Sequence, residues 1–161
     1  MSQHGQPAEI AELICRLDLQ PHPEGGYFRE LFRSSQPVFS SRVQADRAAM
    51  THIYFLLATG QHSRFHQVAH EELWHFYAGD PLHLLLFDGQ QLHSHRLDGE
   101  RNHCLLVPAG YFQAAETTGR YSLVGCTVAP GFDFADFRFL ADQPASAARL
   151  RQLTDDGERF L

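Results

Sequence analysis

The fold of this chain is decided by one stretch, Gly60–Gly79, which reads GQHSRFHQVAHEELWHFYAG. His66 follows the first glycine after five residues, Glu72 lies six positions further on, and the closing glycine comes after six more residues. This spacing predicts a strand with an inward imidazole, a tight turn and a returning strand with an inward carboxylate. We expect the two strands to pair antiparallel, so that His66 and Glu72 converge on one cavity. An imidazole beside a carboxylate is suited either to metal binding or to acid–base chemistry.

The sequence on both sides of this stretch is a succession of short apolar or alternating runs separated by turn signals. Asp88-Gly89 is a strong hairpin signal between two of these runs. Many short strands at this spacing indicate a sandwich or barrel. The predicted strands are Tyr27–Arg33, Thr51–Leu57, Arg64–Val68, Leu73–Ala78, Leu82–Phe87, Gln91–Arg96, Cys104–Val107, Phe112–Ala114 and Ser122–Val128.

The two ends of the chain have a different pattern. Apolar residues at helical spacing predict an amphipathic helix over Ala8–Leu19 and a short helix over Ala145–Leu153. We therefore expect an all-β fold in a single domain over residues 1–161, with a barrel at about 27–139 and short N- and C-terminal helices.

The composition excludes several classes of protein. The formal charge is −6, which argues against nucleic acid as a partner. All 13 basic residues are Arg, so a lysine Schiff base and a P-loop are excluded. The three cysteines form no C-x-x-C pair and predict free thiols in a reducing, cytoplasmic setting. The polar stretch Met1–Pro7 predicts no signal peptide, and no window approaches the roughly 18 apolar residues of a membrane span.

A second stretch, Pro108–Gln113, reads PAGYFQ and completes a recognisable pattern. Its Pro-x-Gly turn changes the direction of the chain, so that the side chain of Gln113 is expected to point into the same barrel. The glycines, His and Glu of Gly60–Gly79 are in register with the first cupin motif, and the Pro and Gly here are in register with the second. Four motif positions depart from this resemblance. Val68 and Gln113 stand where the cupin motifs have His, and Asn102 and Thr117 stand where the second motif has its leading Gly and trailing Asn.

A longer resemblance covers almost the whole chain. The strings that carry it are Pro21–Glu30 (PHPEGGYFRE), Ile53–Leu57 (IYFLL), Glu72–Asp80 (ELWHFYAGD) and Val128–Phe134 (VAPGFDF). They are similar to the signature of a small cupin family, often called cupin superfamily 5 or a domain of unknown function. The resemblance implies an RmlC-like jelly roll, or double-stranded β-helix, that is usually a homodimer and has an internal cavity.

His66 and Glu72 are the candidate catalytic residues. The alternatives are a buried structural histidine and a solvated turn carboxylate beside Glu71. Arg64 shares strand parity with His66, so we expect its guanidinium in the cavity, either paired with Glu72 or free for an anionic ligand. Trp74 shares parity with Glu72, and we expect it either to stack a ring-shaped ligand or to pack in the core.

The remaining candidate substrate-binding residues are Gln113 in the second motif, and Glu24 and Arg29 near the pair Gly25-Gly26. The glycines of the loop Pro21–Gly26 permit positive φ. Glu24 and Arg29 are expected either to line the mouth of the cavity or to hold this loop in place.

A metal is not expected in this pocket. Cupins typically bind their metal with three His and one Glu, whereas the corresponding positions here offer one His, one Glu, one amide and a valine. Amides are weak ligands for transition metals, and valine cannot coordinate. Either His70 or His75 could replace a missing imidazole, but neither matches the motif. We therefore predict no metal and no cofactor.

The sequence favours a protein that binds a small polar metabolite inside the barrel, with three versions left open. The first is a metal-independent isomerase or epimerase, in which His66 is the general base and Arg64 or Gln113 stabilises an enolate oxygen. The second is a non-catalytic binding or sensing module. The third is a metal-dependent oxygenase with an atypical site.

Overall fold

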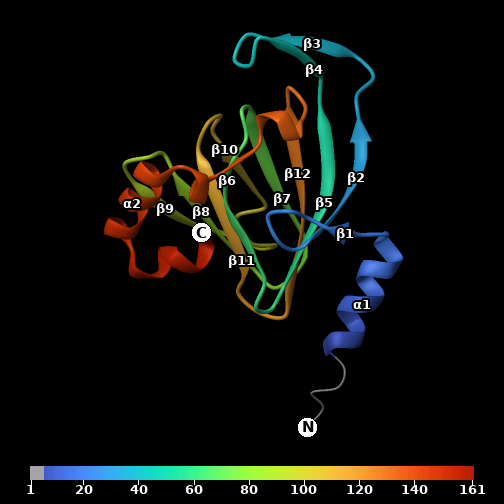
Figure 1. The fold of residues 1–161 in the computed structure, drawn as a ribbon. Helices are drawn as coiled ribbons and strands as arrows, with labels where there is room; N and C mark the ends of the chain where they lie inside the picture. The colour runs from blue at the N-terminus through green and yellow to red at the C-terminus, as the bar shows by residue number, and fades with distance from the viewer. Residues whose placement is uncertain (1–5) are drawn as a thin grey trace.

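A computed structural model describes residues 6–161, so the polar stretch expected to lack a signal peptide falls mostly outside the described residues. Two antiparallel sheets face each other and form the body of the molecule (Figure 1). The six-stranded sheet contains, in spatial order, β1 (Gln20–Pro21), β2 (Tyr27–Arg33), β5 (Thr51–Ala58), β12 (Tyr121–Ala129), β7 (Glu71–Gly79) and β10 (Cys104–Val107). The five-stranded sheet contains β13 (Arg138–Phe139), β6 (His62–Gln67), β11 (Phe112–Thr117), β8 (Leu82–Phe87) and β9 (Leu92–Leu97). The predicted all-β jelly roll is confirmed.

Strands β6 and β7 do not pair with each other, and the expectation that they do is wrong. β6 pairs with β11 and β13, whereas β7 pairs with β10 and β12. The short connection 68–70 therefore carries the chain from one sheet to the facing sheet. Crossing between sheets lets each strand bury one face in the shared core. His66 and Glu72 consequently approach each other from opposite walls of the barrel.

Side chains from the inner faces of both sheets form the main core. Trp74 and Phe55 are its largest members, each 1% exposed, and their rings meet edge to face with centroids 5.8 Å apart. Aromatic pairs of this geometry add to the free energy gained by burying their surface. The cavity described below borders this core, because Phe55 and Cys126 belong to both.

Helices cover part of the outer face of each sheet. α1 (Gln6–Leu17) packs through Leu13 against Leu56 and Leu123 of the six-stranded sheet. α2 (Pro144–Leu153) and the 3-10 helix η3 (Asp155–Phe160) cover the five-stranded sheet with Leu150 and Phe160. Both predicted helices are present with boundaries shifted by one or two residues. Among residues 6–161, none of the helices has the length and apolar character needed to cross a bilayer.

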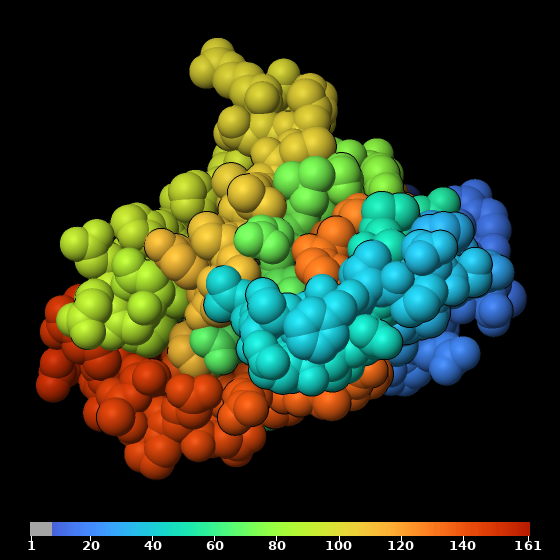
Figure 2. All heavy atoms as spheres, turned by 90° about the horizontal axis from the view of Figure 1, so that it is seen from above, coloured from blue at the N-terminus to red at the C-terminus, as the bar shows by residue number. Residues whose placement is uncertain are grey.

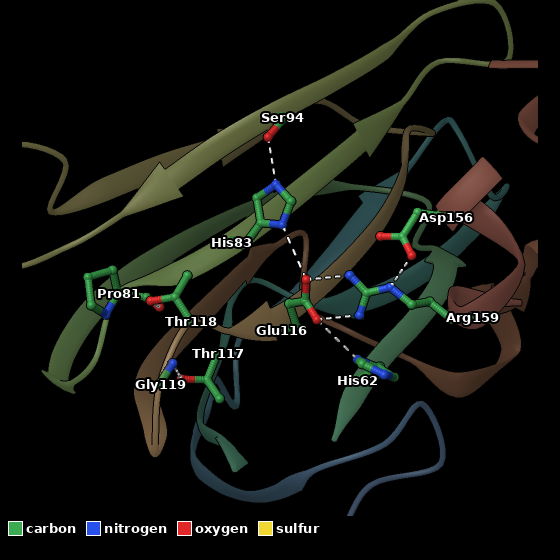
Figure 3. Close-up of polar contacts among 10 residues, drawn as sticks. All are labelled: His62, Pro81, His83, Ser94, Glu116, Thr117, Thr118, Gly119, Asp156 and Arg159. Carbon is green, nitrogen blue, oxygen red and sulfur yellow. Dashed lines mark hydrogen bonds and ion pairs between the residues drawn. The ribbon is translucent and has the colours of Figure 1, made fainter. Parts of the chain in front are cut away.

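A cluster of charged residues anchors η3 to the outer face of the five-stranded sheet (Figure 3). Arg159 donates to both carboxylate oxygens of Glu116, one of them at 2.6 Å, and to Asp156 at 2.7 Å. His62 and His83 each lie 3.5 Å from the same Glu116 carboxylate. Because the guanidinium already occupies both oxygens, this cluster is an anchor for the C-terminal segment.

The sequence did not predict the hairpin of β3 (Pro37–Ser40) and β4 (Ala45–Ala48), which extends over the top of the barrel (Figure 1). Its strands are short and partly polar, so they lack the apolar alternation that indicates a strand. Arg47 pairs through two hydrogen bonds of 2.7 and 2.8 Å with Asp136, in the 3-10 helix η1 (Phe134–Asp136). Seen from above, the hairpin and the segment around residues 130–140 lie side by side (Figure 2).

Candidate functional site

A cavity of about 250 Å³ opens at the upper end of the barrel, between the six-stranded sheet and two loops. Aromatic rings and a few polar groups line it, and Phe134, which is 53% exposed, stands at its mouth. Its lining residues are His22, Glu24, Phe28, Glu30, Arg33, Thr51, Ile53, Phe55, Val68, Glu72, Cys126, Val128, Phe132, Asp133 and Phe134. An apolar pocket with few convergent polar groups is the usual form of a small-molecule site.

The loop before β2 delivers the carboxylate of Glu24 to this cavity. Gly25 has φ +113°, and a Cβ there would lie 2.0 Å from the carbonyl oxygen of His62. Only glycine fits such an approach, which bears out the positive φ expected for this loop. The backbone N–H of Arg64 donates to the Glu24 carbonyl at 2.8 Å and ties the loop to β6. The loop is therefore part of the barrel wall, and Glu24 is buried in it.

Glu24 and His66 form a buried ion pair. The Glu24 carboxylate lies 3.0 Å from Nε2 of His66 and accepts a hydrogen bond of 2.8 Å from the Ser63 hydroxyl. Nδ1 of His66 lies 2.8 Å from the carbonyl oxygen of Arg64, which can only accept, so Nδ1 must carry a proton. With that proton in place, Nε2 can hydrogen-bond the carboxylate only if it is protonated too. His66 is therefore an imidazolium, and its ring stacks on Phe137 at 5.2 Å.

The pKa values of the pair agree with this assignment. Burial alone would lower the pKa of His66, but the carboxylates of Glu24 and Glu72 outweigh burial and raise that pKa above 6.5. Burial would likewise raise the pKa of Glu24, but His66, His22 and the Ser63 hydrogen bond hold that pKa below 4.5. Both shifts favour the charged form of their group.

His22 lies on the other side of Glu24 and is neutral. Burial lowers its pKa, although the Glu24 carboxylate acts in the opposite direction. Its Nδ1 accepts the backbone N–H of Glu24 at 3.2 Å, which places the ring proton on Nε2. Because His22 lines the cavity, this Nε2–H is a donor that a ligand oxygen can use.

Glu72 is positioned by a chain of buried hydrogen bonds. The indole N–H of Trp74 donates to Oε1 of Gln113 at 2.8 Å, and Nε2 of Gln113 donates to Glu72. Since an indole can only donate, it fixes which end of the amide faces Glu72. The thiol of Cys126 lies close enough to this carboxylate to favour its ionised form. Trp74 and Gln113 are fully engaged and act on Glu72 rather than on the open cavity.

Glu72 is a cavity group with a strongly shifted pKa. Burial raises its pKa to about 7, although the imidazolium of His66 and the amide of Gln113 both favour the ionised form. The thiol of Cys126 stays protonated, because burial and the nearby carboxylates raise its pKa well above its ordinary value. A carboxyl group that titrates near neutral pH in a pocket is typical of a functional site.

Arg64 lies outside the cavity, and the expectation that it faces the cavity is wrong. Its guanidinium stacks 4.1 Å above the ring of Phe139 and donates to the carbonyl of Pro23 at 3.0 Å. It makes no ion pair with Glu72, which is held instead by Gln113.

A β-bulge explains why strand parity misplaced this residue. The register between β11 and β6 runs from Gln113 opposite His66 to Ala115 opposite Ser63, so β6 contains one extra residue over this interval. An extra residue breaks the alternation of faces between Ser63 and His66. Parity counted from His66 therefore assigns Arg64 to the wrong side of the strand.

Arg29 is also away from the cavity. It is exposed, and its guanidinium donates to the carbonyl of Leu17 at the C-terminal end of α1, at 3.2 Å. Alternation along β2 could have shown this, because Arg29 lies between Phe28 and Glu30, which both line the cavity. The arginine that lines the cavity is Arg33, which pairs with Glu30 at 2.8 Å.

Sequence reasoning missed several lining residues, chiefly His22, Cys126 and the phenylalanines of the loop after β12. Cys126 had a usable signal, because it alternates with Val124 and Val128 in a predicted strand. His22 and the phenylalanines had none, since they lie in loops where parity does not apply.

The residues at the cupin metal positions do not fit a metal. His66 uses both ring nitrogens within the protein, Gln113 uses both ends of its amide, and Val68 has no donor atom. His70 lies 2.6 Å from the Ser40 hydroxyl, and His75 contacts Thr127 at 3.0 Å on the outer face of its sheet, so neither replaces a missing ligand. Across residues 6–161, no group of three or more His, Cys, Asp and Glu side chains is arranged to hold a metal ion.

Comparisons with known proteins agree with this architecture. A solved structure of a protein from Shewanella oneidensis is 34% identical, covers 92% of this chain and 94% of its own, and has a TM-score of 0.80. An uncharacterized protein of Saccharomyces cerevisiae is 29% identical over 154 residues, covering 83% of this chain and 76% of its own. A cupin 2 conserved barrel domain protein from Rhodopseudomonas palustris, at 14% identity over 88% of this chain and 84% of its own, has a TM-score of 0.57 and shows the fold alone. The model of the family described as Cupin superfamily (DUF985) matches residues 11–140, and the chain belongs to this family.

Proposed function

We propose that the protein binds a small metabolite with a ring in its barrel cavity and transfers a proton to and from it through Glu72. The observation that carries this proposal is a cavity-lining carboxyl group whose pKa is raised to about 7. A general acid or base works best when its pKa lies near the working pH. The phenylalanines of the wall supply apolar surface for the face of a ring.

The reaction class that fits is a metal-independent isomerisation beside a carbonyl group. The Glu72 carboxylate removes a proton from the carbon next to the carbonyl, and the C–H electron pair moves to the carbonyl oxygen to form an enolate. Return of the proton to a neighbouring carbon, or to the other face of the same carbon, completes the isomerisation or epimerisation. The Nε2–H of His22 stabilises the enolate oxygen as a hydrogen-bond donor.

This assignment moves the role of general base from His66 to Glu72. His66 is already protonated and donates to Glu24, so it has no free lone pair with which to take a proton. The charged pair of Glu24 and His66 instead sets the electrostatic environment of Glu72. Gln113 and Trp74 position Glu72, and Arg64 has no part in the chemistry because its guanidinium lies elsewhere.

A hydrogen-exchange experiment tests the proposal. Sugars and keto acids are incubated with the protein in D₂O, and loss of the proton next to the carbonyl is followed by NMR. We expect exchange with at least one compound, and we expect Glu72→Gln to lower its rate by a factor of 100 or more, on the order of the contribution of a general base. The control is Glu71→Gln, which changes the exposed neighbouring carboxylate and leaves the rate unchanged. Equal exchange rates in the protein and in Glu72→Gln would reject the proposal.

The second candidate function is a binding or sensing module without turnover. It is favoured by the complete internal pairing of His66 and Gln113, which leaves few groups free for chemistry. If Glu72→Gln keeps full affinity for a ligand that shows no exchange in the unchanged protein, the sensing function replaces the enzymatic one.

We further propose that the protein is a cytoplasmic homodimer that uses the outer face of the six-stranded sheet. Leu31, Tyr77 and Leu106 are 41, 45 and 52% exposed on that sheet, which is unusual for large apolar side chains. All three cysteines are free, in keeping with a reducing compartment. Sedimentation is expected to give twice the chain mass of 18.3 kDa, and Leu106→Asp is expected to lower it toward one chain. A mass of 18.3 kDa for the unchanged protein would contradict the dimer.

A further inference from the structure

A polar groove lies next to the cavity, at the junction of the β3–β4 hairpin and the segment that follows β12. Its volume is about 570 Å³. The residues that line it are Arg42, Val43, Arg47, Gln67, Val68, Ala69, Gly110, Ala135, Asp136, Arg138 and Gln143. Figure 2 shows the hairpin and the 130–140 segment side by side at this end of the barrel. The groove thus gathers three arginines from two segments far apart in the sequence.

The arginines of the groove outnumber its carboxylates. Arg47 is neutralised by Asp136 through a two-point contact and is nearly buried, with a side chain 14% exposed. Arg42 and Arg138 make no side-chain hydrogen bond or ion pair with residues 8–161, although Arg138 is close enough to lower the pKa of Asp136. Arg42 and Arg138 are both exposed, so the groove presents two guanidinium groups with free donors.

Other titratable groups lie close to the groove but outside its lining. Burial lowers the pKa of His70, with Arg47 and Arg42 acting in the same direction and Asp136 and Glu71 opposing them, so this imidazole is neutral at pH 7. Asp142 lines an adjacent hollow with Arg138 but forms no ion pair with it. Among the residues that line the groove, three arginines and Asp136 leave an excess of two positive charges, and Asp133 and Glu71 lie near it outside the lining.

The groove also contains neutral groups suited to an anion. Gln143, which precedes α2, makes no side-chain hydrogen bond to the backbone of that helix. Gln67 donates to the carbonyl of Gly110 and thereby holds the turn that forms one wall. Guanidinium groups present planar pairs of N–H donors that match the oxygens of phosphate.

We infer that this groove is a binding site for the phosphate group of a small metabolite. A phosphate monoester carries between −1.5 and −2 charges at about pH 7, which matches the two unpaired guanidinium groups. A single carboxylate would leave one of them unpaired. The site is distinct from the cavity, because its lining shares only Val68 with it. The inference does not depend on proton transfer by Glu72.

A titration with inorganic phosphate and phenyl phosphate at low ionic strength tests the inference, with backbone amide shifts as the readout. We expect both anions to shift the amides of Gly110 and Asp136. Arg42→Gln combined with Arg138→Gln should weaken binding on the order of a hundred-fold, about ten-fold for each charged hydrogen-bond donor. The matched control is Arg16→Gln with Arg101→Gln, which removes the same charge from exposed arginines elsewhere and should keep the affinity.

The outcomes distinguish phosphate binding in the groove from non-specific electrostatic attraction of phosphate to the protein. Equal weakening in the two double variants, or shifts confined to other parts of the chain, would overturn the inference. Absence of any phosphate-dependent shift at low ionic strength would overturn it too. Tighter binding of phenyl phosphate with added shifts at Phe134 would support a ligand that reaches the cavity, and equal affinity of the two anions would support free phosphate at the same site. Thermal melts of all variants establish that they are folded.

Discussion

Replacement of Glu72 by Gln should stabilise the protein at alkaline pH relative to acidic pH. The pKa of Glu72 is 4.5 when the group is freely solvated and about 7 in the folded protein. At about 1.4 kcal/mol for each pKa unit, the ionised folded state is less stable by about 3 kcal/mol than it would be with a solvated carboxylate. Gln is nearly isosteric and offers an oxygen to the Nε2–H of Gln113, so the variant keeps the local packing while losing the titration.

The sign of the effect follows from proton binding. Between pH 4.5 and about 7 the folded protein holds a proton on Glu72 that the unfolded chain has released, so stability falls as pH rises through this interval. The stability that Glu72 contributes is complete below 4.5 and is lost above about 7. The Gln variant has no such dependence at this position. Its free energy of unfolding relative to the unchanged protein should therefore rise by about 3 kcal/mol between pH 4.5 and pH 8.5.

Urea unfolding at several pH values measures this difference directly. Any fixed cost of the substitution, such as an imperfect hydrogen bond with Gln113, is the same at each pH and cancels in the comparison. The control variant Glu71→Gln changes an exposed side chain one position away and should follow the unchanged protein at every pH. A difference between Glu72→Gln and the unchanged protein that stays constant from pH 4.5 to 8.5 would show that Glu72 does not titrate near neutral pH, and would remove the basis for its role as acid or base.

Three further substitutions test the buried ion pair, the loop that holds Glu24 and the hydrogen bonds that position Glu72. Glu24→Gln leaves the buried imidazolium of His66 unpaired and should cost about 3–5 kcal/mol at pH 6 in urea unfolding. The ion pair stabilises the fold most between pH 4.5 and 6.5 and loses its effect as His66 deprotonates. A cost that did not shrink toward pH 9 would contradict the ion pair. Gly25→Ala should lower the melting temperature far more than Gly60→Ala. Both glycines have positive φ, but only a Cβ at position 25 would lie 2.0 Å from a backbone oxygen. Equal decreases in melting temperature would refute the close approach. Trp74→Phe removes the donor that orients the buried amide of Gln113 and should cost about 1–3 kcal/mol of stability. It should also raise the pKa of Glu72, which carboxyl NMR can measure. An unchanged pKa would show that the indole does not position Glu72.

Much of the fold was predictable from local pattern. The bounds of β2, β8 and β10 match the predicted strands residue for residue, because alternation and turn signals both act within a few residues. Trp74 lies on the same buried face as Glu72, as strand parity predicts. The sequence could also identify His66, Glu72 and Gln113 as neighbours, since the motif spacing places all three on strands of one barrel.

The tertiary structure alone decided how these residues are arranged and which of them are charged. The crossing of the chain between the sheets at 68–70 and the extra residue in β6 depend on partners far away in the sequence, and the second of these turned Arg64 out of the cavity. Glu24 reaches His66 only because a loop folds against β6. The protonation states follow from the same contacts. His66 is an imidazolium because a carbonyl and a carboxylate meet its two nitrogens, and the pKa of Glu72 is raised to about 7 because the group is buried among residues of both sheets and the loops. Side-chain spacing is a property of one strand, whereas desolvation and charge pairing are sums over everything that surrounds a group, and no local pattern in the sequence contains them.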